Sequence, residues 1–293
     1  MVSICYMGSV NRWECDENDH LNVRFYAQKI DQAVAVFLSE AGIRSGEART
    51  TGLHIRFVQE ARIATPLRVD CALISAERGR WEVLSLMRQN LTDAPIAGFI
   101  TRVEGAALSA EASHVDAAPE WAAPRGLDPD DPFPLPESPG QAEAGGFRMM
   151  GRGRIGAWEC DAAGVALPEI YIGRISDGMP NLWAFTTDAA EAGQRRAGAL
   201  GGAALEYRLD VFAPLNRDDT FRHLSGIRDI GNKTQHMVHL LVCESRDEIV
   251  VRAEAIGVGM DLQTRKAVPI SDVRRRQLEK LKIGLSLIHI SEP

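Results

Sequence analysis

The chain has 293 residues, which is long for one hydrophobic core and sufficient for two domains of ordinary size. Its 45% hydrophobic and 25% charged residues are typical of a soluble globular protein, and the net charge of −7 argues against nucleic-acid or anionic-membrane partners, which need a basic surface. The sequence shows neither an apolar run of the roughly 20 residues that span a bilayer nor a signal peptide, so we expect a cytoplasmic protein.

The first unit, residues 1–107, begins with a short strand-like stretch. Residues 23–41 then carry apolar side chains at spacings of three and four, which predicts a helix with one buried stripe, and Gly42 ends it. Four strand-like segments follow, separated by proline or glycine: 52–62, 67–77, 80–90 and 95–104. One long helix followed by antiparallel strands predicts an α+β domain.

Residues 108–147 are rich in Pro, Ala, Asp and Gly and lack apolar periodicity, so we expect an extended, partly disordered linker. The second unit, residues 148–284, repeats the first, with a short strand and then a helical segment within 168–190. A basic helix, residues 272–283, closes it. Its predicted strands are 203–213, 219–229, 235–245 and 248–260.

The tetrapeptide Trp-Glu-Cys-Asp at residues 13–16 returns at residues 158–161, 145 positions later. An identity that contains Trp and Cys, both rare, seldom arises by chance. At the same offset Tyr26 pairs with Tyr171. Self-similarity at a fixed offset indicates that one unit was duplicated, and it directs attention to the residues at which the two copies differ.

The residues after the first copy resemble the signature of the hotdog-fold acyl-CoA thioesterases. In that signature an Asp is followed by His four residues on, Asn six on and Tyr ten on. Asp16, His20, Asn22 and Tyr26 match all four positions, although Asp19 stands where the family usually has Gly. Asp19 in place of Gly bears on the local geometry of the turn that precedes His20.

The second copy is more similar to the 4-hydroxybenzoyl-CoA thioesterase branch, because Asp161 is followed by the expected Gly164, and residues 231–234 (Gly-Asn-Lys-Thr) resemble a strand motif of the family. The resemblance implies two tandem hotdog domains, each an antiparallel sheet wrapped around one long helix, paired as an intramolecular pseudo-dimer. It implies an acyl-CoA substrate and no cofactor. The acyl chain, an acyl-carrier-protein thioester as substrate, and assembly of pseudo-dimers into a homo-oligomer stay open.

Thioester hydrolysis needs an attacking group and a donor for the carbonyl oxygen that gains negative charge. A carboxylate at a helix entrance can attack the carbonyl or deprotonate a water, and the helix N-terminus offers unpaired N–H groups. In the 4-hydroxybenzoyl-CoA thioesterase branch, the donor is the amide seven residues after the Asp. That position is Val23 in the first copy and Pro168, which has no N–H, in the second.

The copies also differ between the acid and this donor. Val165 and Leu167 stand where the first copy has His20 and Asn22. We therefore predict that Asp16 is the working nucleophile or general base rather than only a turn residue. The second half would complete the pocket across the interface.

The other candidate residues each have two interpretations. Asp161 is a relic or a second active acid, and His20 holds the turn or bonds the thioester region. Asn22 is a helix N-cap or a substrate contact. Tyr26 belongs to the buried stripe or lines the substrate pocket, for which Thr234 is a further candidate.

Two other functional classes stay open. The (R)-specific enoyl-CoA hydratases share the hotdog fold and use an Asp–His pair, but their His lies five residues after the Asp and follows Gly-Asp. Here the spacing is four, and Glu14-Cys15 precede Asp16. A double hotdog without catalytic activity could instead bind acyl groups or proteins, which is compatible with the eroded second copy.

Several other signals carry no functional prediction. The five cysteines lack metal-ligand spacing and indicate reduced thiols. Residues 151–156 match GxGxxG but precede a strand instead of a helix, so a dinucleotide site is not expected. His236 and His239 lie three apart in a predicted strand and point to opposite faces, which argues against a metal site. The basic residues 274–276 could meet the phosphates of coenzyme A or form a solvated helix face.

Residues 285–293, Leu-Ser-Leu-Ile-His-Ile-Ser-Glu-Pro, resemble the translation of a transposon adapter used in sequencing libraries. We interpret them as a non-native tail; the alternative is an ordinary short terminus. On the first interpretation the natural C-terminus is missing, and no function is drawn from His289.

Overall fold

The computed structural model describes residues 2–44, 46–77, 79–105 and 112–284. The predicted tail, 285–293, and the first residues of the predicted linker, 108–111, lie outside the described residues. The first half contains a 3-10 turn at Arg12–Glu14 and these elements: β1 (Ser3–Ser9), α1 (Val23–Glu40), β2 (Ala48–Phe57), β3 (Pro66–Glu77), β4 (Arg80–Gln89) and β5 (Pro95–Gly105).

The second half has the same order of elements after a short helix, α2 (Pro139–Ala144), at the end of the connecting segment. A 3-10 turn at Ala157–Glu159 again precedes the long helix. The elements are β6 (Arg148–Arg154), α3 (Pro168–Thr186), α4 (Ala189–Arg196), β7 (Leu200–Val211), β8 (Thr220–Ile230), β9 (Thr234–Cys243), β10 (Glu248–Asp261), β11 (Lys266–Val268) and α5 (Asp272–Glu279).

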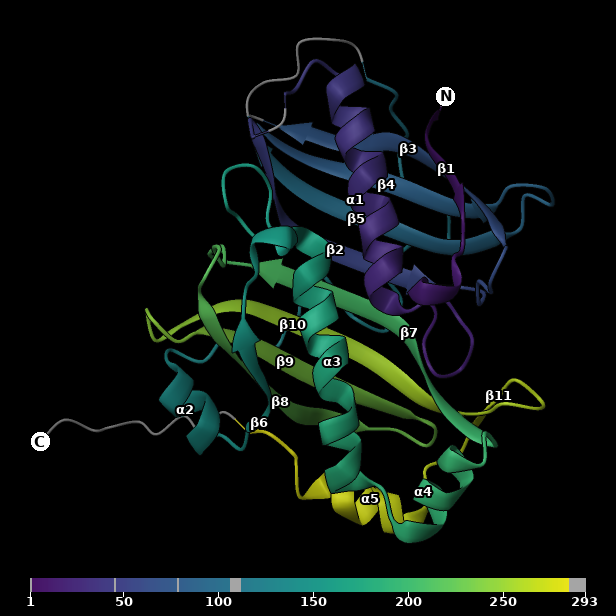
Figure 1. Ribbon diagram of the computed structural model, residues 1–293, viewed down its shortest axis with the longest axis vertical. Helices are drawn as coiled ribbons and strands as arrows, with labels where there is room; N and C mark the ends of the chain where they lie inside the picture. Colours follow the sequence, from purple (N-terminus) through teal and green to yellow (C-terminus); the bar gives the residue numbers. More distant parts are fainter. Residues whose placement is uncertain (1, 45, 78, 106–111, 285–293) are drawn as a thin grey trace, which may run out of the picture.

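The described strands form one antiparallel 11-stranded sheet in the order β1-β3-β4-β5-β2-β7-β10-β9-β8-β6, with β11 paired to β10. The long helices α1 and α3 lie side by side on one face of this sheet (Figure 1). The predicted α+β class and the tandem hotdog arrangement are therefore confirmed: each half is a sheet wrapped around one long helix.

The two halves join edge to edge through β2 and β7. These strands pair antiparallel, with Leu53 opposite Leu209 and Ile55 opposite Tyr207. Because β2 and β7 occupy equivalent places in the two halves, the pairing gives the chain an approximate internal twofold symmetry. This is the pseudo-dimer that the resemblance implied.

The helix boundaries follow from the sequence pattern. Helix α1 begins and ends within one residue of its predicted span, and its buried stripe includes Tyr26, Ile30 and Phe37. Strand β2 lies about four residues before its predicted position. Residues 58–65 instead form a loop against the entrance of α1, where the carbonyl of Ala61 accepts a hydrogen bond from the N–H of Leu21 at 2.8 Å.

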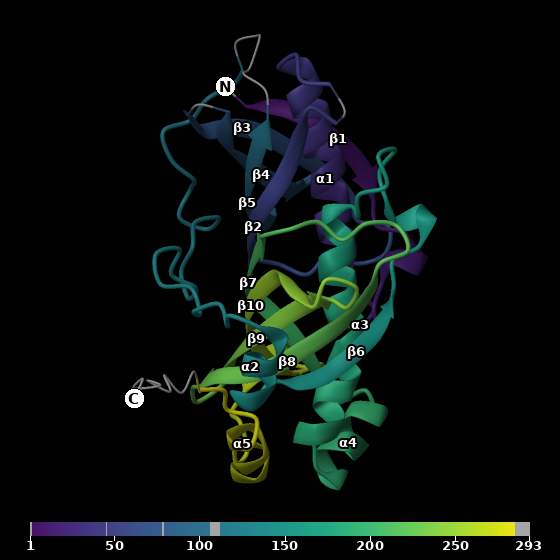
Figure 2. The same cartoon turned by 90° about the vertical axis from the view of Figure 1, so that its left-hand side faces the viewer.

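The described part of the predicted linker, residues 112–147 (the strap), crosses the sheet face opposite the long helices (Figure 2). Its backbone N–H groups at Arg125 and Gly126 donate to Glu206 at 2.9 and 2.7 Å, and that of Phe133 donates to Glu254 at 2.8 Å. The strap is thus extended, as predicted, but packed instead of partly disordered. Buried carboxylates of the sheet accept some of its backbone N–H groups, Ser113 and Val115 bond the backbone of Leu73 in β3, and α2 lies near its end.

Among the described residues, none of the helices has the length and apolar character needed to cross a membrane.

Candidate active site

The repeated tetrapeptide builds the same local structure twice. In each half its Glu accepts the N–H of the residue that starts the 3-10 turn: Glu14 that of Asn11, and Glu159 that of Gly156, both at 2.8 Å. Each Glu is also paired with a cation of the long helix, Glu14 with Lys29 at 2.7 Å. The repeat therefore fixes the entry into the long helix, and its last residue, the Asp predicted to be catalytic, lies directly after the buried Glu and the Cys.

Asp16 shapes the turn with one oxygen and leaves the other available. Its Oδ1 accepts the N–H groups of Asn18 at 2.8 Å and His20 at 3.2 Å, whereas its Oδ2 has no hydrogen-bond partner among the described residues. Asp161 makes the same two contacts in the second copy. One carboxylate oxygen of Asp16 is thus free to react while the other holds the loop.

The turn also explains why Asp19 can replace the usual glycine. Asp19 has φ 59°, and the matching Gly164 has φ 82°, so both adopt the left-handed conformation. Asp is among the non-glycine residues that tolerate this region best. The departure from the family pattern therefore leaves the turn geometry intact.

The two helix entrances are in register, without a gap. The N–H of Asn22 donates to the carbonyl of Glu14, and that of Leu167 donates to Glu159, both at 2.9 Å. Helix α1 then begins at Val23 and α3 at Pro168. The N–H of Val23 has no hydrogen-bond partner in the described parts of the chain, whereas Pro168 has no N–H to offer.

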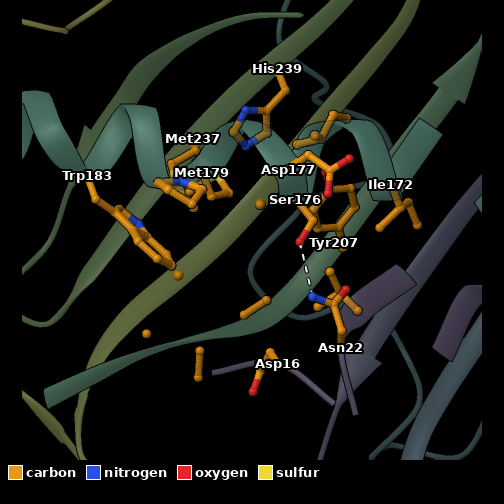
Figure 3. A pocket seen from close by; sticks show the side chains of 18 of the residues that line it. Asp16, Asn22, Ile172, Ser176, Asp177, Met179, Trp183, Tyr207, Met237 and His239 are labelled. Carbon is orange, nitrogen blue, oxygen red and sulfur yellow. Dashed lines mark hydrogen bonds between the residues drawn. The ribbon is translucent and has the colours of Figure 1, made fainter. Parts of the chain in front are cut away.

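Asp16 and Val23 open onto a cavity of about 400 Å³ between the two halves, the Asp16 cavity. Asn22 caps α1 by accepting the N–H of Arg24 at 2.9 Å, and its Nδ2 donates to Ser176 Oγ across the interface at 3.4 Å (Figure 3). Asn22 is therefore the N-cap of α1 and also lines the cavity, and its contact with a substrate stays a prediction.

The remainder of the Asp16 cavity lies between α3 and the sheet of the second half. Its wall is mainly apolar, which suits the hydrocarbon part of an acyl group. Figure 3 shows Trp183 and Met179 on the opposite side of the cavity from Asp16 and Asn22. The first half thus contributes the entrance, and the second half contributes the interior.

The equivalent cavity of the second copy, the Asp161 cavity, has a volume of about 590 Å³. Its entrance holds Asp161, Leu167 and Pro168, and its interior is formed by α1 and β2 of the first half. Asp31 of α1 lies there, at the position that Ser176 occupies in α3. Burial, and secondarily the charge of Glu169, raises the pKa of Asp31 to about 7. This cavity therefore has the acid but neither the helix-entry amide nor the capping Asn.

His20 does not line the Asp16 cavity. Its Nε2 lies 3.0 Å from a carboxylate oxygen of Glu60 and 2.8 Å from Arg265, a residue of the second half. Burial lowers the pKa of His20, and the Glu60 carboxylate opposes this effect. Of the two interpretations of His20, the structure supports the turn-holding one.

Tyr26 is a core residue and not a pocket residue. Its hydroxyl accepts the N–H of Ala61 at 3.1 Å, and its ring packs edge-on against Phe57 at 5.2 Å. Tyr171 makes the equivalent bond with the N–H of Leu215 at 3.2 Å. The two tyrosines thus have the same role in the repeat: each hydroxyl bonds the long helix to the neighbouring loop.

Thr234 is also outside the Asp16 cavity, so its assignment to the pocket is wrong. Alternate residues of a strand point to opposite faces, and Gln235, Met237 and His239 are those of β9 that face α3. Thr234 and His236 face away. The resemblance to the family's strand motif located the right strand but not the residue that lines the cavity.

The two histidines of β9 confirm the opposite-face prediction. His236 bonds Glu254 beside the strap at 2.9 Å, and His239 bonds Ser225 under α3 at 2.7 Å. Within the described residues, no group of His, Cys, Asp and Glu side chains could hold a metal ion.

Two residues of the cavity wall, Tyr207 and His239, escaped the sequence analysis. They come from different strands, β7 and β9, and only the strand register shows that they meet. The one available signal was the alternation in β9, which placed His239 on the face opposite His236.

The family model of the thioesterase-like superfamily matches residues 10–136 and 155–278. The chain belongs to this superfamily, which places it among the thioester hydrolases. A search among curated proteins gave no match.

Solved structures with the same fold include three thioesterases. A protein of Lactobacillus plantarum provisionally named an oleoyl thioesterase has a TM-score of 0.63 at 9% identity, covering 88% of this chain and 96% of that one. An acyl-ACP thioesterase of Bacteroides thetaiotaomicron has 0.59 at 11% identity, covering 87% and 97%. A 12:0-ACP thioesterase of Umbellularia californica has 0.58 at 12% identity, covering 87% and 93%. At these identities the likeness concerns the fold.

Proposed function

We propose that this thioester hydrolase cleaves an acyl-CoA to the free acid and coenzyme A, with Asp16 as its nucleophile or general base and the N–H of Val23 as the donor to the carbonyl oxygen. One observation carries the proposal: a carboxylate oxygen and a helix-entry N–H, both without a hydrogen-bond partner among the described residues, open onto the same cavity. The cytoplasm, expected from the sequence, is its proposed location.

The chemistry balances by either route. As a general base, Asp16 takes a proton from water, and the resulting hydroxide attacks the thioester carbonyl. As a nucleophile, Asp16 attacks directly and forms a mixed anhydride that water then hydrolyses. In both routes the carbonyl oxygen becomes negative, the Val23 N–H stabilises it, and collapse of the tetrahedral intermediate expels the coenzyme A thiolate.

The Asp161 cavity is proposed to be inactive. It retains Asp161, but Pro168 offers no N–H at the position that matches Val23. The hydratase alternative is disfavoured by His20, because an Asp–His pair needs both side chains at the substrate and His20 faces Glu60 and Arg265.

The test is purified protein incubated with a panel of acyl-CoA and acyl-carrier-protein thioesters in the presence of a thiol reagent. We expect thiol release that Asp16→Ala abolishes and Asp161→Ala retains. Hydration of crotonyl-CoA without thiol release would select the hydratase instead. Equal loss in both variants would overturn the assignment of one working copy, and absence of turnover across the panel would favour a binding protein.

A further inference from the structure

Buried polar side chains lie on the face of the second half's sheet that packs against α3. His223, Ser225 and His239 form a hydrogen-bonded cluster under α3 (the His–Ser–His cluster). Ser225 Oγ lies 2.8 Å from His223 Nε2 and 2.7 Å from His239 Nδ1. The ring of Tyr207 stacks parallel to that of His239, with 6.5 Å between their centroids. His239 is 1% exposed and Tyr207 is 5% exposed.

In the part of the chain that the structure describes, three polar atoms of this group make no hydrogen bond: the hydroxyl of Tyr207, Nε2 of His239 and Nδ1 of His223. Tyr207 and His239 line the Asp16 cavity, whereas His223 does not. A buried polar group without a partner destabilises the folded protein, so such groups in a native structure require an explanation. For Tyr207 and His239 the cavity itself offers one, because a bound ligand can supply the missing partner.

The His–Ser–His cluster determines what His239 can offer. Burial lowers the pKa of His223 to about 3 and that of His239 well below its usual value, so both rings are neutral. The Ser225 hydroxyl carries one proton: it donates to one histidine and accepts from the other. When it donates to His239 Nδ1, Nε2 of His239 carries a proton; when it donates to His223, Nε2 is an acceptor. His239 therefore adapts to a donor or to an acceptor in the ligand.

The fold itself does not require these polar groups, as the first half shows. Arg148 pairs with Ser225 as Ser3 pairs with Cys71, so the registers of the two sheets can be matched. Following the pairing across the strands, Leu53 is equivalent to Tyr207, and Ser85 is equivalent to His239. Val69 likewise matches His223. The first half thus packs the same positions without a tyrosine or a histidine.

We propose that Tyr207 and His239 bind an oxygen substituent, a hydroxyl or keto group, on the acyl chain of the substrate. This inference rests on the proposed function for the thioester itself and adds the class of acyl group. A hydroxyl can accept from Tyr207 and donate to His239, and a keto oxygen can accept from both. Figure 3 shows His239 across the cavity from Asp16, so the substituent lies away from the thioester.

Matched substrate pairs test the inference directly. Wild-type protein is assayed with acyl-CoAs of equal length that carry or lack a hydroxyl or keto group, in aliphatic and aromatic series. We expect kcat/KM to favour an oxygenated member by more than ~10-fold, because a site that hydrogen-bonds a substituent discriminates against the analogue without it. Equal or faster turnover of every unsubstituted partner would overturn the inference and leave water as the ligand of these atoms.

Tyr207→Phe removes only the hydroxyl and keeps the ring, so the stacking and the fold are preserved. We expect it to lower the preference for the oxygenated substrate by about 10-fold, measured as the ratio of kcat/KM within each matched pair. His239→Phe is the second variant. Ser85→Ala, at the position equivalent to His239 in the first half, is the matched control and should leave the preference unchanged. Unchanged discrimination in Tyr207→Phe and His239→Phe would contradict the inference.

Binding separates this inference from the proposed function. Non-hydrolysable thioether analogues of each pair are titrated by calorimetry into wild-type protein and Tyr207→Phe. Tighter binding of the oxygenated analogue that is lost in Tyr207→Phe, in a protein that hydrolyses no thioester, would support the inference and contradict the proposed function. If the protein hydrolyses both thioesters of a pair and binds their two analogues with equal affinity, the proposed function is supported and the inference is contradicted.

Discussion

The two halves share the local structure around the entrance of the long helix, and they differ in the residues that line their cavities. Each has the 3-10 turn, the buried Glu, the turn-forming Asp and the Tyr that ties the long helix to its loop. The entrance of the first half keeps the capping Asn22 and the free N–H of Val23, whereas the interior of the second half has Tyr207 and His239. Because each cavity combines the entrance of one half with the interior of the other, both specialisations meet in the Asp16 cavity.

The comparison indicates how a duplicated domain can divide its work. In a symmetric dimer each copy must serve as entrance and interior at once. In the tandem chain the entrance of the second copy could lose its donor, since Pro168 affects only the Asp161 cavity. Its interior could in turn acquire polar groups that serve only the Asp16 cavity.

The largest expected difference between the halves is the effect on kcat of replacing Asp16 or its counterpart Asp161. Asp16→Asn keeps an oxygen that accepts the N–H groups of Asn18 and His20, so the turn should survive, but it removes the carboxylate that we propose as nucleophile or general base. We expect kcat to fall by about 10²- to 10⁴-fold, the usual range for loss of a catalytic base. The matched Asp161→Asn should change kcat by less than about twofold. Thiol-release kinetics measures both variants, and comparable decreases in kcat would contradict the assignment of one working acid.

The second prediction exchanges the helix-entry residues. Val23→Pro copies Pro168 into the first half, where Asn22 has φ −66° and ψ 144°, close to the φ −64° and ψ 146° of Leu167 before Pro168. The backbone thus already accepts proline, which is favoured at the first helical position. We expect kcat to fall about 100-fold with little loss of stability, because one oxyanion donor disappears.

Pro168→Val is the matched control for that exchange. It supplies an N–H at the entrance of α3, which lies on the Asp161 cavity, so the activity of the Asp16 cavity should not change. An unchanged kcat in Val23→Pro would show that the amide of Val23 does not stabilise the transition state.

The third prediction concerns a feature that the halves share. Tyr26→Phe leaves the buried N–H of Ala61 without its acceptor, and Tyr171→Phe does the same to Leu215. We expect each to lower the free energy of unfolding by about 1–3 kcal/mol, measured by urea denaturation. If only one of the two variants loses stability, the two tyrosines do not have equivalent roles in their halves.

The smallest expected effect is the pH dependence that Asp31 of the first half contributes, because the matching Ser176 of the second half does not titrate. The pKa of Asp31 is about 7 in the folded protein against an ordinary value of 3.8, so between these pH values the folded state holds a proton that the unfolded chain releases. Its contribution to stability therefore falls as pH rises through this window. Asp31→Ser, which copies Ser176, should raise the free energy of unfolding at pH 8 by roughly 1–2 kcal/mol, less than the full shift because Asp31 is only half-buried.

The control for Asp31 is Glu40→Gln, which removes an exposed carboxylate from the end of the same helix. It should leave the pH dependence of the urea midpoint unchanged. If Asp31→Ser also leaves it unchanged, the carboxyl of Asp31 does not titrate in this window.

The sequence predicted the features that depend on local pattern. The apolar stripe of α1 predicts the bounds of that helix, and the turn residues between strands predict where the strands end. The repeat aligns Val23 with Pro168, and the structure has both residues at the first position of their helices. Family resemblance supplied the hotdog arrangement, and Asp16 and Asn22 do line one cavity.

What escaped prediction depends on contacts between distant segments. His20 turns away because Glu60 and Arg265 hold it, and Arg265 lies in the other half. Tyr207 and His239 meet only through the register of β7, β10 and β9. The packing of the strap also escaped prediction, because the backbone N–H groups of Arg125 and Phe133 bond to Glu206 and Glu254 in distant strands.

The number of working sites per chain tests the central claim most directly. A non-hydrolysable analogue of the best acyl-CoA substrate, with a methylene inserted between the carbonyl and the sulfur so that the carbonyl oxygen is kept, is titrated into wild-type protein, Val23→Pro and Pro168→Val. The stoichiometry is measured by calorimetry. The composite-site account predicts one site per chain in all three, weakened only in Val23→Pro. Two equivalent sites in the wild type, or equal weakening in both variants, would contradict it.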